Sequence, residues 1–240
     1  MENNTPRHIG YILDGNRRWA KKHGLPTYEG HLAGVNALEE VIRESINQGV
    51  KYISFYTWST ENWKRAEAEV LGIMKLVRML FKRELKKLIK EGCRLVVMGS
   101  REHVPADIVQ MIDEAETQSR NGTKATLIMC FNYGGQQEIV RAAQKYADYL
   151  LQGASLKQTE RPKDDVISVE EFENYLDHPE VPPCDLIVRT SGEQRLSNFM
   201  LWRSAYSEFI FLDTLWPDMQ KEDVARIIEE YSHRSRRYGV

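Results

Sequence analysis

Six short apolar runs, almost unbroken by polar residues, alternate along the chain with longer stretches of helical periodicity. The runs are His8–Leu13, Val50–Tyr56, Arg94–Met98, Ala125–Phe131, Asp185–Thr190 and Glu208–Leu212. A strand that is apolar at nearly every position is suited to burial on both faces, as in a parallel sheet. Amphipathic helical patterns fill the intervals, over Gly30–Asn47, Glu67–Glu91, Pro105–Gln118, Gln136–Gln152 and Lys221–Arg236. This alternation predicts an α/β fold with a mostly parallel central sheet of about six strands flanked by helices.

The chain shows no internal repeat, low-complexity tract or shift in composition, so residues 1–240 are expected to form a single domain. Ser168 and Glu171 have the spacing of a capping box and predict a short helix over Val169–Leu176. The polar segment Gly153–Asp165 before it is expected to be a loop.

Charge and composition exclude several classes of protein. The 33 Lys and Arg residues against 35 Asp and Glu residues give a net charge of −2, whereas a general nucleic-acid binder carries a basic excess. No apolar run is long enough to span a membrane, and Met1–Gly10 lacks the apolar core of a secretory signal. The three cysteines lack CxxC spacing, which excludes a disulfide framework or a zinc knuckle. We therefore expect a soluble cytoplasmic protein without a nucleic-acid partner.

The segment Asp14–Trp19 follows the first predicted strand, where α/β sheets bind ligands. A glycine turn that enters a helix presents N–H groups to an anion, and Arg17 and Arg18 add charged donors. Asp14 would repel a phosphate unless a cation lies between them, which points to Mg²⁺. An ordinary turn before a solvated basic helix, with Asp14 as its N-cap, explains the fragment equally well. Neither GxxxxGK[ST] nor GxGxxG occurs in the chain.

Two further loops are dense in polar and aromatic residues. Thr57–Arg65 follows the second strand and holds two tryptophans, an amide, hydroxyls and an arginine; the alternative is a packed loop in which Ser59 or Asn62 caps a helix. Arg189–Asn198 follows the fifth strand and predicts a second oxyanion site. His31 could contact a phosphate or simply begin a helix. Two anion sites beside one metal site imply two phosphorylated substrates, or one substrate with two phosphate groups.

Taken together, these motifs resemble the cis-prenyltransferases, the undecaprenyl diphosphate synthase family. The resemblance is carried, in order and at family spacing, by His8–Ala20, Gly30–Gly34, Ser59–Arg65, Asn132–Gly135, Asp185–Asn198, Leu215–Pro217 and Arg236–Gly239. It covers nearly the whole chain. It implies a homodimeric, Mg²⁺-dependent transferase that condenses isopentenyl diphosphate onto an allylic diphosphate, usually farnesyl diphosphate, with Z stereochemistry. The implied product is a medium-to-long polyprenyl diphosphate for lipid-carrier synthesis of cell-wall glycans, with at most peripheral contact at the membrane surface.

The resemblance also implies roles for individual residues. The allylic diphosphate would be held by Gly15, Asn16, Arg17, Arg18, Trp19 and His31. Isopentenyl diphosphate would be held by Arg189, Arg195, Leu196 and Ser197, with Ser59, Thr60, Glu61, Trp63 and Arg65 lining the site between the two. Asp14 and Glu208 match the magnesium ligands, and Asp14 and Asn62 match the catalytic pair. Mg²⁺ and arginines at the departing diphosphate would lower the barrier as charge develops there.

Asn62 matches the family's proposed proton acceptor. A neutral amide is too weak a base to act alone, so the alternative is that Asn62 orients a water or a diphosphate oxygen. The two helices Gly30–Asn47 and Glu67–Glu91 are expected to wall an apolar product channel. Thr57 is modest in size, which predicts an open channel.

The sequence departs from the family pattern at three positions. Arg17 stands where many members have glycine, Thr27 where an arginine is common, and Ala66 where a proline is frequent. None of these changes removes a catalytic position. A phosphohydrolase using Asp14 is disfavoured, because Asn16 stands where the second aspartate is expected. A non-catalytic scaffold subunit of the same fold is the other alternative, although such subunits generally lose residues that this chain retains.

The C-terminal Arg237–Gly239 resembles the family's RxG tail, which is expected to reach the isopentenyl diphosphate site of the partner subunit.

Overall fold

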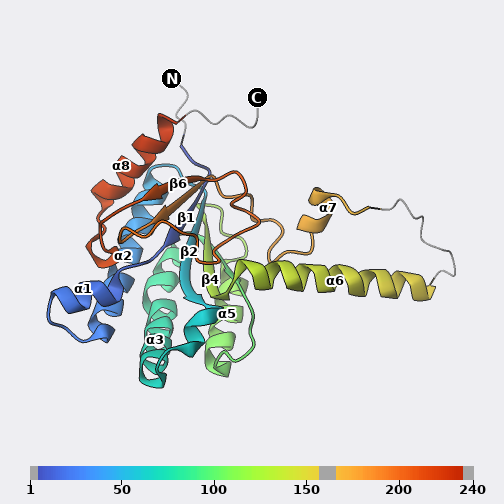
Figure 1. Cartoon of the computed structure of the whole chain (residues 1–240), viewed down its shortest axis with the longest axis horizontal. Coiled ribbons are helices and arrows are strands. Elements are labelled where there is room, and N and C mark those ends of the chain that lie inside the picture. The colour runs from blue at the N-terminus through green and yellow to red at the C-terminus, as the bar shows by residue number, and fades with distance from the viewer. Residues whose placement is uncertain (1–4, 157–165, 235–240) are drawn as a thin grey trace.

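Six parallel strands form one sheet in the computed structural model, which describes residues 5–156 and 166–234 (Figure 1). The strands are β1 (His8–Ile12), β2 (Tyr52–Ser59), β3 (Arg94–Met98), β4 (Thr126–Tyr133), β5 (Leu186–Arg189) and β6 (Glu208–Phe211). They lie in the order β3-β4-β2-β1-β5-β6, and each adjacent pair is parallel. All six predicted strands are therefore confirmed, with ends that differ by at most a few residues. The direction of the chain across the sheet reverses between β1 and β5, where a binding crevice is expected.

The helices follow the predicted pattern, with differences at their ends. They are α1 (Asn16–Lys22), α2 (Thr27–Asn47), η1 (Thr60–Lys64), α3 (Glu67–Leu80), η2 (Phe81–Leu85), α4 (Lys86–Lys90), α5 (Ala106–Ser119), α6 (Gly135–Leu156), α7 (Val169–Glu173), η3 (Trp216–Asp218) and α8 (Lys221–Ser232). The helix predicted over Glu67–Glu91 is interrupted by the π-helical turn η2. Among the described residues, no helix is both long and apolar enough to cross a membrane.

Several predicted boundaries are wrong. The helix α2 begins at Thr27 rather than Gly30, and α7 ends at Glu173 rather than Leu176. The helix predicted over Lys221–Arg236 ends at Ser232, because Arg234 turns back and donates to the Glu208 carboxylate and the Phe209 carbonyl, both at 2.9 Å. The loop predicted over Gly153–Asp165 starts too early, because α6 continues to Leu156. Residues 157–165 lie outside the described part of the chain.

The two faces of the sheet are covered differently. On one face, α2, α3, α5 and α8 bury the larger apolar core, which includes Ile9, Ile53, Phe55, Leu127 and Val188. On the other face, Ile128 and Ile187 pack against Phe199 and Met200, which lie outside any helix. Irregular chain therefore replaces the expected helices over much of the second face. The long helix α6 projects away from the body of the molecule (Figure 1).

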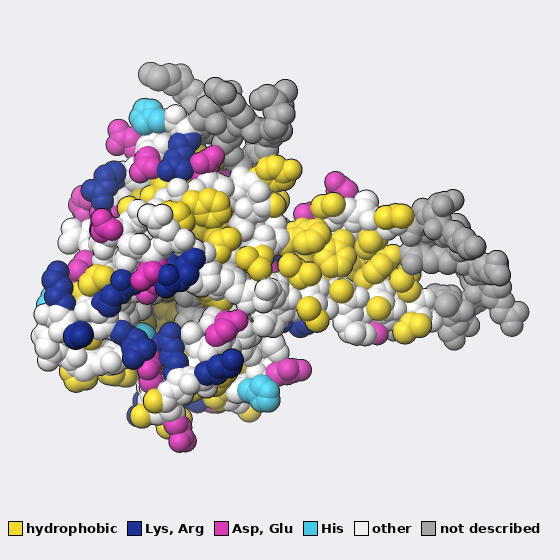
Figure 2. Space-filling model, in the orientation of Figure 1, with side chains coloured by type: hydrophobic (Ala, Val, Ile, Leu, Met, Phe, Trp, Pro, Cys, Tyr) yellow, Lys and Arg dark blue, Asp and Glu magenta, His cyan; other side chains and the backbone are white. Residues whose placement is uncertain are grey.

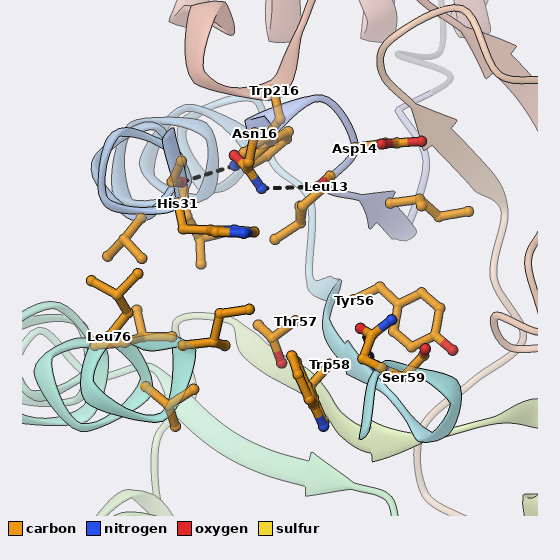
Figure 3. A pocket seen from close by; sticks show the side chains of 18 of the residues that line it. Leu13, Asp14, Asn16, His31, Tyr56, Thr57, Trp58, Ser59, Leu76 and Trp216 are labelled. Carbon is orange, nitrogen blue, oxygen red and sulfur yellow. Dashed lines mark hydrogen bonds between the residues drawn. The ribbon is translucent and has the colours of Figure 1, made fainter. Parts of the chain in front are cut away.

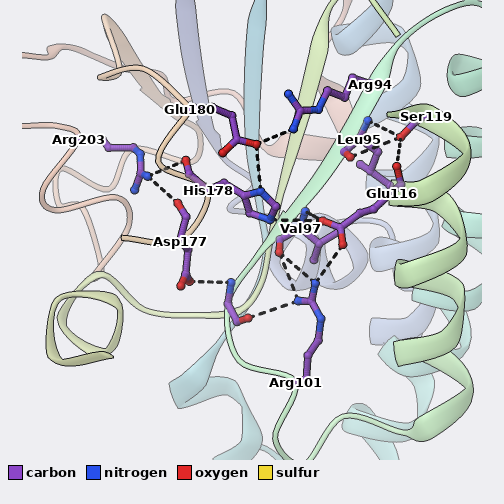
Figure 4. Close-up of polar contacts among 11 residues, drawn as sticks. Arg94, Leu95, Val97, Arg101, Glu116, Ser119, Asp177, His178, Glu180 and Arg203 are labelled. Carbon is purple, nitrogen blue, oxygen red and sulfur yellow. Dashed lines mark hydrogen bonds and ion pairs between the residues drawn. The ribbon is translucent and has the colours of Figure 1, made fainter. Parts of the chain in front are cut away.

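A buried ion pair anchors the irregular chain that leads into β5. Arg203 donates to the Glu138 carboxylate at 2.5 Å, and both side chains are almost completely buried. Arg203 also donates to the carbonyls of Asp177 and His178, and His178 is flanked by Glu116 and Glu180 at 3.4 Å (Figure 4). A buried pair is valuable mainly for the geometry it imposes, because desolvation offsets much of its attraction. Here it fixes the approach to β5 and thus the position of the loop after it.

His8 is fully buried at the start of β1 and is held in one tautomer. Its Nδ1 lies 2.9 Å from the carbonyl oxygen of Pro182, which can only accept, so Nδ1 carries the proton. Its Nε2 therefore accepts from the Ser54 hydroxyl at 2.7 Å. Burial lowers the pKa of His8 to about 4, so the imidazole is neutral in the folded protein near pH 7.

This buried imidazole predicts acid sensitivity. The pKa of His8 in the folded protein lies below its unfolded value of about 6.5, so the unfolded chain takes up a proton first as the pH falls. The contribution of His8 to stability is complete above pH 6.5 and is lost as the pH falls toward 4. Between pH 7 and pH 5 we expect the His8 imidazole to lower the free energy of unfolding by about 2 kcal/mol. Urea unfolding measures this free energy, and its dependence on pH should be shallower in His8→Asn than in the wild type.

An NMR titration of the imidazole keeps this prediction testable should the variant fold poorly. A His8 ring that titrates near pH 6.5 in the folded protein would contradict it.

Candidate active site

A cavity of about 310 Å³ opens at the carboxyl ends of β1, β2 and β5 (Figure 3). Its polar lining residues are Asp14, Asn16, His31, Tyr56, Thr57, Ser59, Asn62, Arg65, Arg189 and Ser197. Its apolar lining comes mainly from α2 and α3, through Val35, Leu38, Ile73, Leu76, Val77 and Leu80, with Trp58 and Trp216 beside them. The cavity therefore has a polar mouth and an apolar interior between the two helices predicted as walls.

A second pocket, of about 320 Å³, adjoins the polar mouth. Its lining residues are Leu13, Asp14, Gly15, Asn16, Arg17, Arg18, His31 and Arg65. Three arginines and a histidine, drawn from α1, α2 and the end of η1, thus face one space. The structure brings together most of the residues predicted to hold the first anion.

Trp19 is the exception among those residues. Its indole Nε1 donates to Asp218 at 2.6 Å, and its ring lies 4.1 Å from that of His23. Its side chain lines neither pocket. In this structure Trp19 joins α1 to η3 rather than reaching the ligand space.

Glycines set how closely α1 approaches α2. A Cβ at Gly30 would lie 2.1 Å from the Asn16 carbonyl oxygen, and a Cβ at Gly34 would lie 2.2 Å from Asn16 Oδ1. Both distances are far inside van der Waals contact, so only glycine permits this packing. The first turn of α1, with its arginines, therefore sits directly against the helix that carries His31.

Asp14 is paired with arginine and does not cap α1, whose N-cap is Gly15. Arg189 Nη2 donates to Asp14 Oδ2 at 2.8 Å, and Arg18 Nη2 lies 3.5 Å from Oδ1. Burial alone raises the pKa of Asp14, but the hydrogen bond and charge of Arg189, with the charge of Arg18, hold the pKa below its usual value. Asp14 is therefore a carboxylate at neutral pH, and the N-cap interpretation is wrong.

Arg189 also organises the loop after β5. Its side chain is only 5% exposed, and it donates to Ser197 Oγ at 2.8 Å and to the Arg195 carbonyl. Arg18 reaches the same loop through the carbonyl of Ser191 at 2.9 Å. The two predicted anion sites are thus physically joined. The Arg195 side chain is 59% exposed and pairs with Glu193, and neither Arg195 nor Leu196 lines either of the two pockets described above.

The loop after β2 combines structural and cavity-lining roles. Asn62 Oδ1 accepts from the backbone N–H of Ser59 at 3.1 Å, as the capping alternative predicts, while both residues also line the cavity. Trp63 Nε1 donates to Asn132 Oδ1 at 2.7 Å, which fixes η1 to β4. Glu61 accepts from Asn198 at 3.1 Å, which links η1 to the loop after β5.

The regular pairing of β2 with β4 fails at the cavity. Tyr56 pairs with Cys130 and Trp58 with Phe131, so Thr57 is an extra residue on β2. Asn132, with a φ of 49°, is then the extra residue on β4. Bulges of this kind re-aim side chains beside active sites. Thr57 lines the cavity and donates to the Cys130 carbonyl at 3.0 Å.

Glu208 lies at the opposite end of the sheet from Asp14. It begins β6 and pairs with Leu186, which in turn pairs with Ile9 at the start of β1. Asp14 is five residues beyond Ile9, or about 16 Å further along the strand direction. Within one chain, the structure therefore does not bring the two predicted magnesium ligands together, and Arg234 binds Glu208 instead.

Buried polar atoms without partners gather at the cavity. Five such side-chain atoms occur among the described residues: Asn16 Oδ1, His31 Nε2, Trp58 Nε1, Thr60 Oγ1 and Arg189 Nε. All but Thr60 belong to residues that line the cavity. Because buried polar groups are nearly always hydrogen-bonded, this concentration indicates a site built to receive a polar ligand.

The sequence prediction missed Tyr56 and Trp216, which line the cavity, and Glu69 beside it. Trp216 lines the cavity and donates to the Gly34 carbonyl at 2.8 Å. Glu69 accepts from Arg65 at 2.9 Å. It lies four residues after Arg65 at the start of a predicted helix, and oppositely charged residues at this spacing commonly pair, so the sequence held a signal for this contact. The predicted C-terminal contact of Arg237–Gly239 lies outside the described residues.

Comparisons with known proteins agree with this geometry. The Prenyltransf family model, described as undecaprenyl diphosphate synthase, matches residues 12–239. An isoprenyl transferase of Thermotoga maritima is 43% identical over 234 residues, covering 98% of this chain and 97% of the relative. The trans,polycis-polyprenyl diphosphate synthase ((2Z,6E)-farnesyl diphosphate specific) of Thermobifida fusca is 42% identical, covering 98% of this chain and 80% of the relative.

Among solved structures, lavandulyl diphosphate synthase from Lavandula x intermedia in complex with dimethylallyl diphosphate superposes with a TM-score of 0.91. The two chains are 30% identical, and the match covers both completely. The chain therefore belongs to the undecaprenyl diphosphate synthase family of prenyltransferases, as its motifs predicted.

Proposed function

We propose that the protein adds isopentenyl diphosphate repeatedly to an allylic diphosphate, farnesyl diphosphate in the first instance, with Z stereochemistry. The product would be a medium-to-long polyprenyl diphosphate that serves as a precursor of the lipid carrier in cell-wall glycan synthesis. The observation that carries the proposal is the joining of two arginine-lined anion sites at the mouth of one apolar cavity. A diphosphate with a growing hydrocarbon tail has this division between charged and apolar ends.

In this proposal, the allylic diphosphate occupies the pocket of Arg17, Arg18, His31 and Arg65, and its tail enters the cavity between α2 and α3. Isopentenyl diphosphate binds beside Arg189 and Ser197. As the allylic C–O bond breaks, negative charge grows on the leaving diphosphate, and fixed arginines stabilise that charge. Arg18 contacts both the Asp14 carboxylate and the loop after β5, so it is placed to keep the two substrates in register.

The donors at the mouth fit a Mg²⁺ ion that arrives with a diphosphate. No group of three or more metal-ligating side chains occurs among the described residues. Mg²⁺ is commonly held by one or two carboxylates together with substrate phosphates, and Asp14 supplies an ionised carboxylate here. Asp14 would hold the ion, which when bound neutralises charge on the leaving diphosphate. Glu208 of the same chain is too distant to share it.

Asn62 is proposed to orient the group that takes the proton rather than to take it. Its Oδ1 is already used by the Ser59 N–H, which leaves the amide NH₂ as a donor at the cavity wall. A donor can position a water or a diphosphate oxygen, and the diphosphate oxygen is the more basic of these groups.

The alternatives receive no support from the site. A scaffold subunit has no need of Asp14, Asn62, Arg65 and Arg189 converging on one cavity, as they do here. A phosphohydrolase acting through Asp14 needs a second acid nearby, but Asn16 is wedged against Gly30 and Gly34.

Asp14→Ala and Asp14→Asn should both lose activity while remaining folded. Either change removes the charge that holds the metal ion and steadies Arg189, so we expect kcat to fall by on the order of 10²–10³. The assay uses labelled isopentenyl diphosphate, farnesyl diphosphate and Mg²⁺, with circular dichroism to confirm folding. EDTA should abolish the activity of the wild type equally, and Asp113→Ala on the exposed face of α5 is the control. Full activity of Asp14→Asn would remove the carboxylate from the mechanism.

Thr57→Phe should shorten the product. Each added isoprene unit buries methylenes worth about 0.8 kcal/mol apiece, so growth continues until the channel blocks it sterically. A phenyl ring at the bulge would enter the cavity, whereas the first addition of isopentenyl diphosphate should continue. Thr57→Val, which keeps the volume, should leave the products unchanged. Chromatography of the dephosphorylated products gives the distribution, and an unchanged pattern in Thr57→Phe would refute the channel assignment.

We also propose that two copies form a homodimer. Apolar side chains lie exposed on α6 and near β6, including Val140, Tyr149, Tyr206 and Phe211, and Figure 2 shows apolar surface gathered where α6 leaves the body. Contiguous exposed apolar surface favours association. Sedimentation velocity should give twice the chain mass at micromolar concentration, and a monomer at that concentration would count against the dimer.

Membrane contact is proposed to be peripheral at most. Flotation with anionic vesicles measures it, and tight binding that resists high salt would contradict this proposal.

A further inference from the structure

Two arginines and a histidine from separate elements converge on one carboxylate oxygen. Glu69 Oε1 lies 2.9 Å from Arg65 Nη1, 3.6 Å from His31 Nε2 and 4.0 Å from Arg17 Nε. The Glu69 side chain is only 16% exposed. The Arg65 guanidinium is further confined by the Trp58 ring, whose centroid lies 5.6 Å away. The first turn of α3 thus places one carboxylate beside side chains of α1, α2 and the end of η1.

Glu69 stands behind these three side chains rather than in the ligand space. Arg17, His31 and Arg65 all line the pocket at the cavity mouth, whereas Glu69 lines neither that pocket nor the cavity. A carboxylate that substituted for the ligand would occupy the pocket itself. The arrangement is that of a support, because Glu69 accepts from one side of the Arg65 guanidinium and leaves its remaining donors for the pocket.

His31 lies beside this support without a hydrogen bond to it. Its Nε2 is buried and has no hydrogen-bond partner, because 3.6 Å to Glu69 is too long for one. Burial and the charge of Arg65 lower the pKa of His31, and Glu69 opposes that shift. The imidazole therefore lies at the wall of the pocket, and its Nε2 is available to a ligand.

We propose that Glu69 is a positioning residue for the allylic diphosphate, holding Arg65 in place beside His31 before the ligand arrives. The inference rests on the proposed function for the identity of that ligand. Its advantage is preorganisation: long side chains that are already ordered lose less conformational entropy on binding. The same support does not extend to the isopentenyl diphosphate site, where Asp14 and Ser197 hold Arg189.

The test compares Glu69→Ala and Glu69→Gln with Glu67→Gln. Glu67 lies in the same first turn of α3 and is exposed, so the control makes the same change of charge without touching the cluster. The probe is inorganic diphosphate, titrated calorimetrically into the full-length protein in EDTA so that no metal ion takes part. We expect the Kd to rise about tenfold in Glu69→Ala, less in Glu69→Gln, and less than twofold in Glu67→Gln.

Steady-state kinetics separate positioning from general damage. The KM for the allylic diphosphate should rise in both Glu69 variants, while the KM for isopentenyl diphosphate and the kcat at saturation stay within about twofold of the wild type. Diphosphate binding that is unchanged or tighter in both Glu69 variants would overturn the proposal. If Glu69→Ala fails to fold, Glu69→Gln decides alone. A wild type that binds diphosphate but makes no prenyl product would refute the proposed function and leave the titration to decide the role of Glu69.

Discussion

The ion pair between Asp14 and Arg189 joins the two halves of the site. Asp14 follows β1 and Arg189 ends β5, the neighbouring strands between which the chain reverses its direction across the sheet. The same guanidinium holds Ser197 and the Arg195 carbonyl, so the loop after β5 is built on it. Because this arginine is almost fully buried, losing Asp14 would leave an unmatched charge where water has little access. Both proposed diphosphate positions therefore depend on one contact.

A site that binds anions must first keep its own cations in place. Arginines gathered around an empty pocket repel one another, and each loses hydration as it becomes buried. Here carboxylates outside or beside the ligand space relieve that repulsion, with Asp14 serving Arg189, Glu69 serving Arg65 and Glu193 serving Arg18. The number of acidic residues near the mouth is thus a consequence of the number of basic ones. The net charge of this region therefore underestimates the number of cationic groups that face the ligand space.

Sequence pattern predicted the six strands and the residues that follow them, because parallel strands buried on both faces are nearly continuous apolar runs and their carboxyl ends share one edge. The pattern did not predict helix ends that depend on a tertiary contact. The end of α8 is such a case, because Arg234 binds Glu208 just after it. Nor did it show that irregular chain covers one face, since Phe199 and Met200 carry no periodic signal. The family resemblance assigned Trp19 to the allylic diphosphate and Glu208 to the metal ion. In the structure Trp19 contacts Asp218 and Glu208 contacts Arg234, and motif spacing does not encode either contact.

The bulge at Thr57 shows how a regular sheet acquires an apolar cavity. In continuous pairing, side chains alternate strictly between the two faces, and the helices on each face pack down onto them. One extra residue on β2 and one on β4 interrupt that alternation near the carboxyl ends of the two strands. Thr57 therefore lines the cavity beside α2 and α3. Asn132 stabilises the irregularity by accepting from Trp63 and donating to the carbonyls of Ser100 and Glu102. The polar contacts of Asn132 therefore serve the cavity indirectly, by stabilising the irregular register through which β2 and β4 pair up to Ser59 and Tyr133.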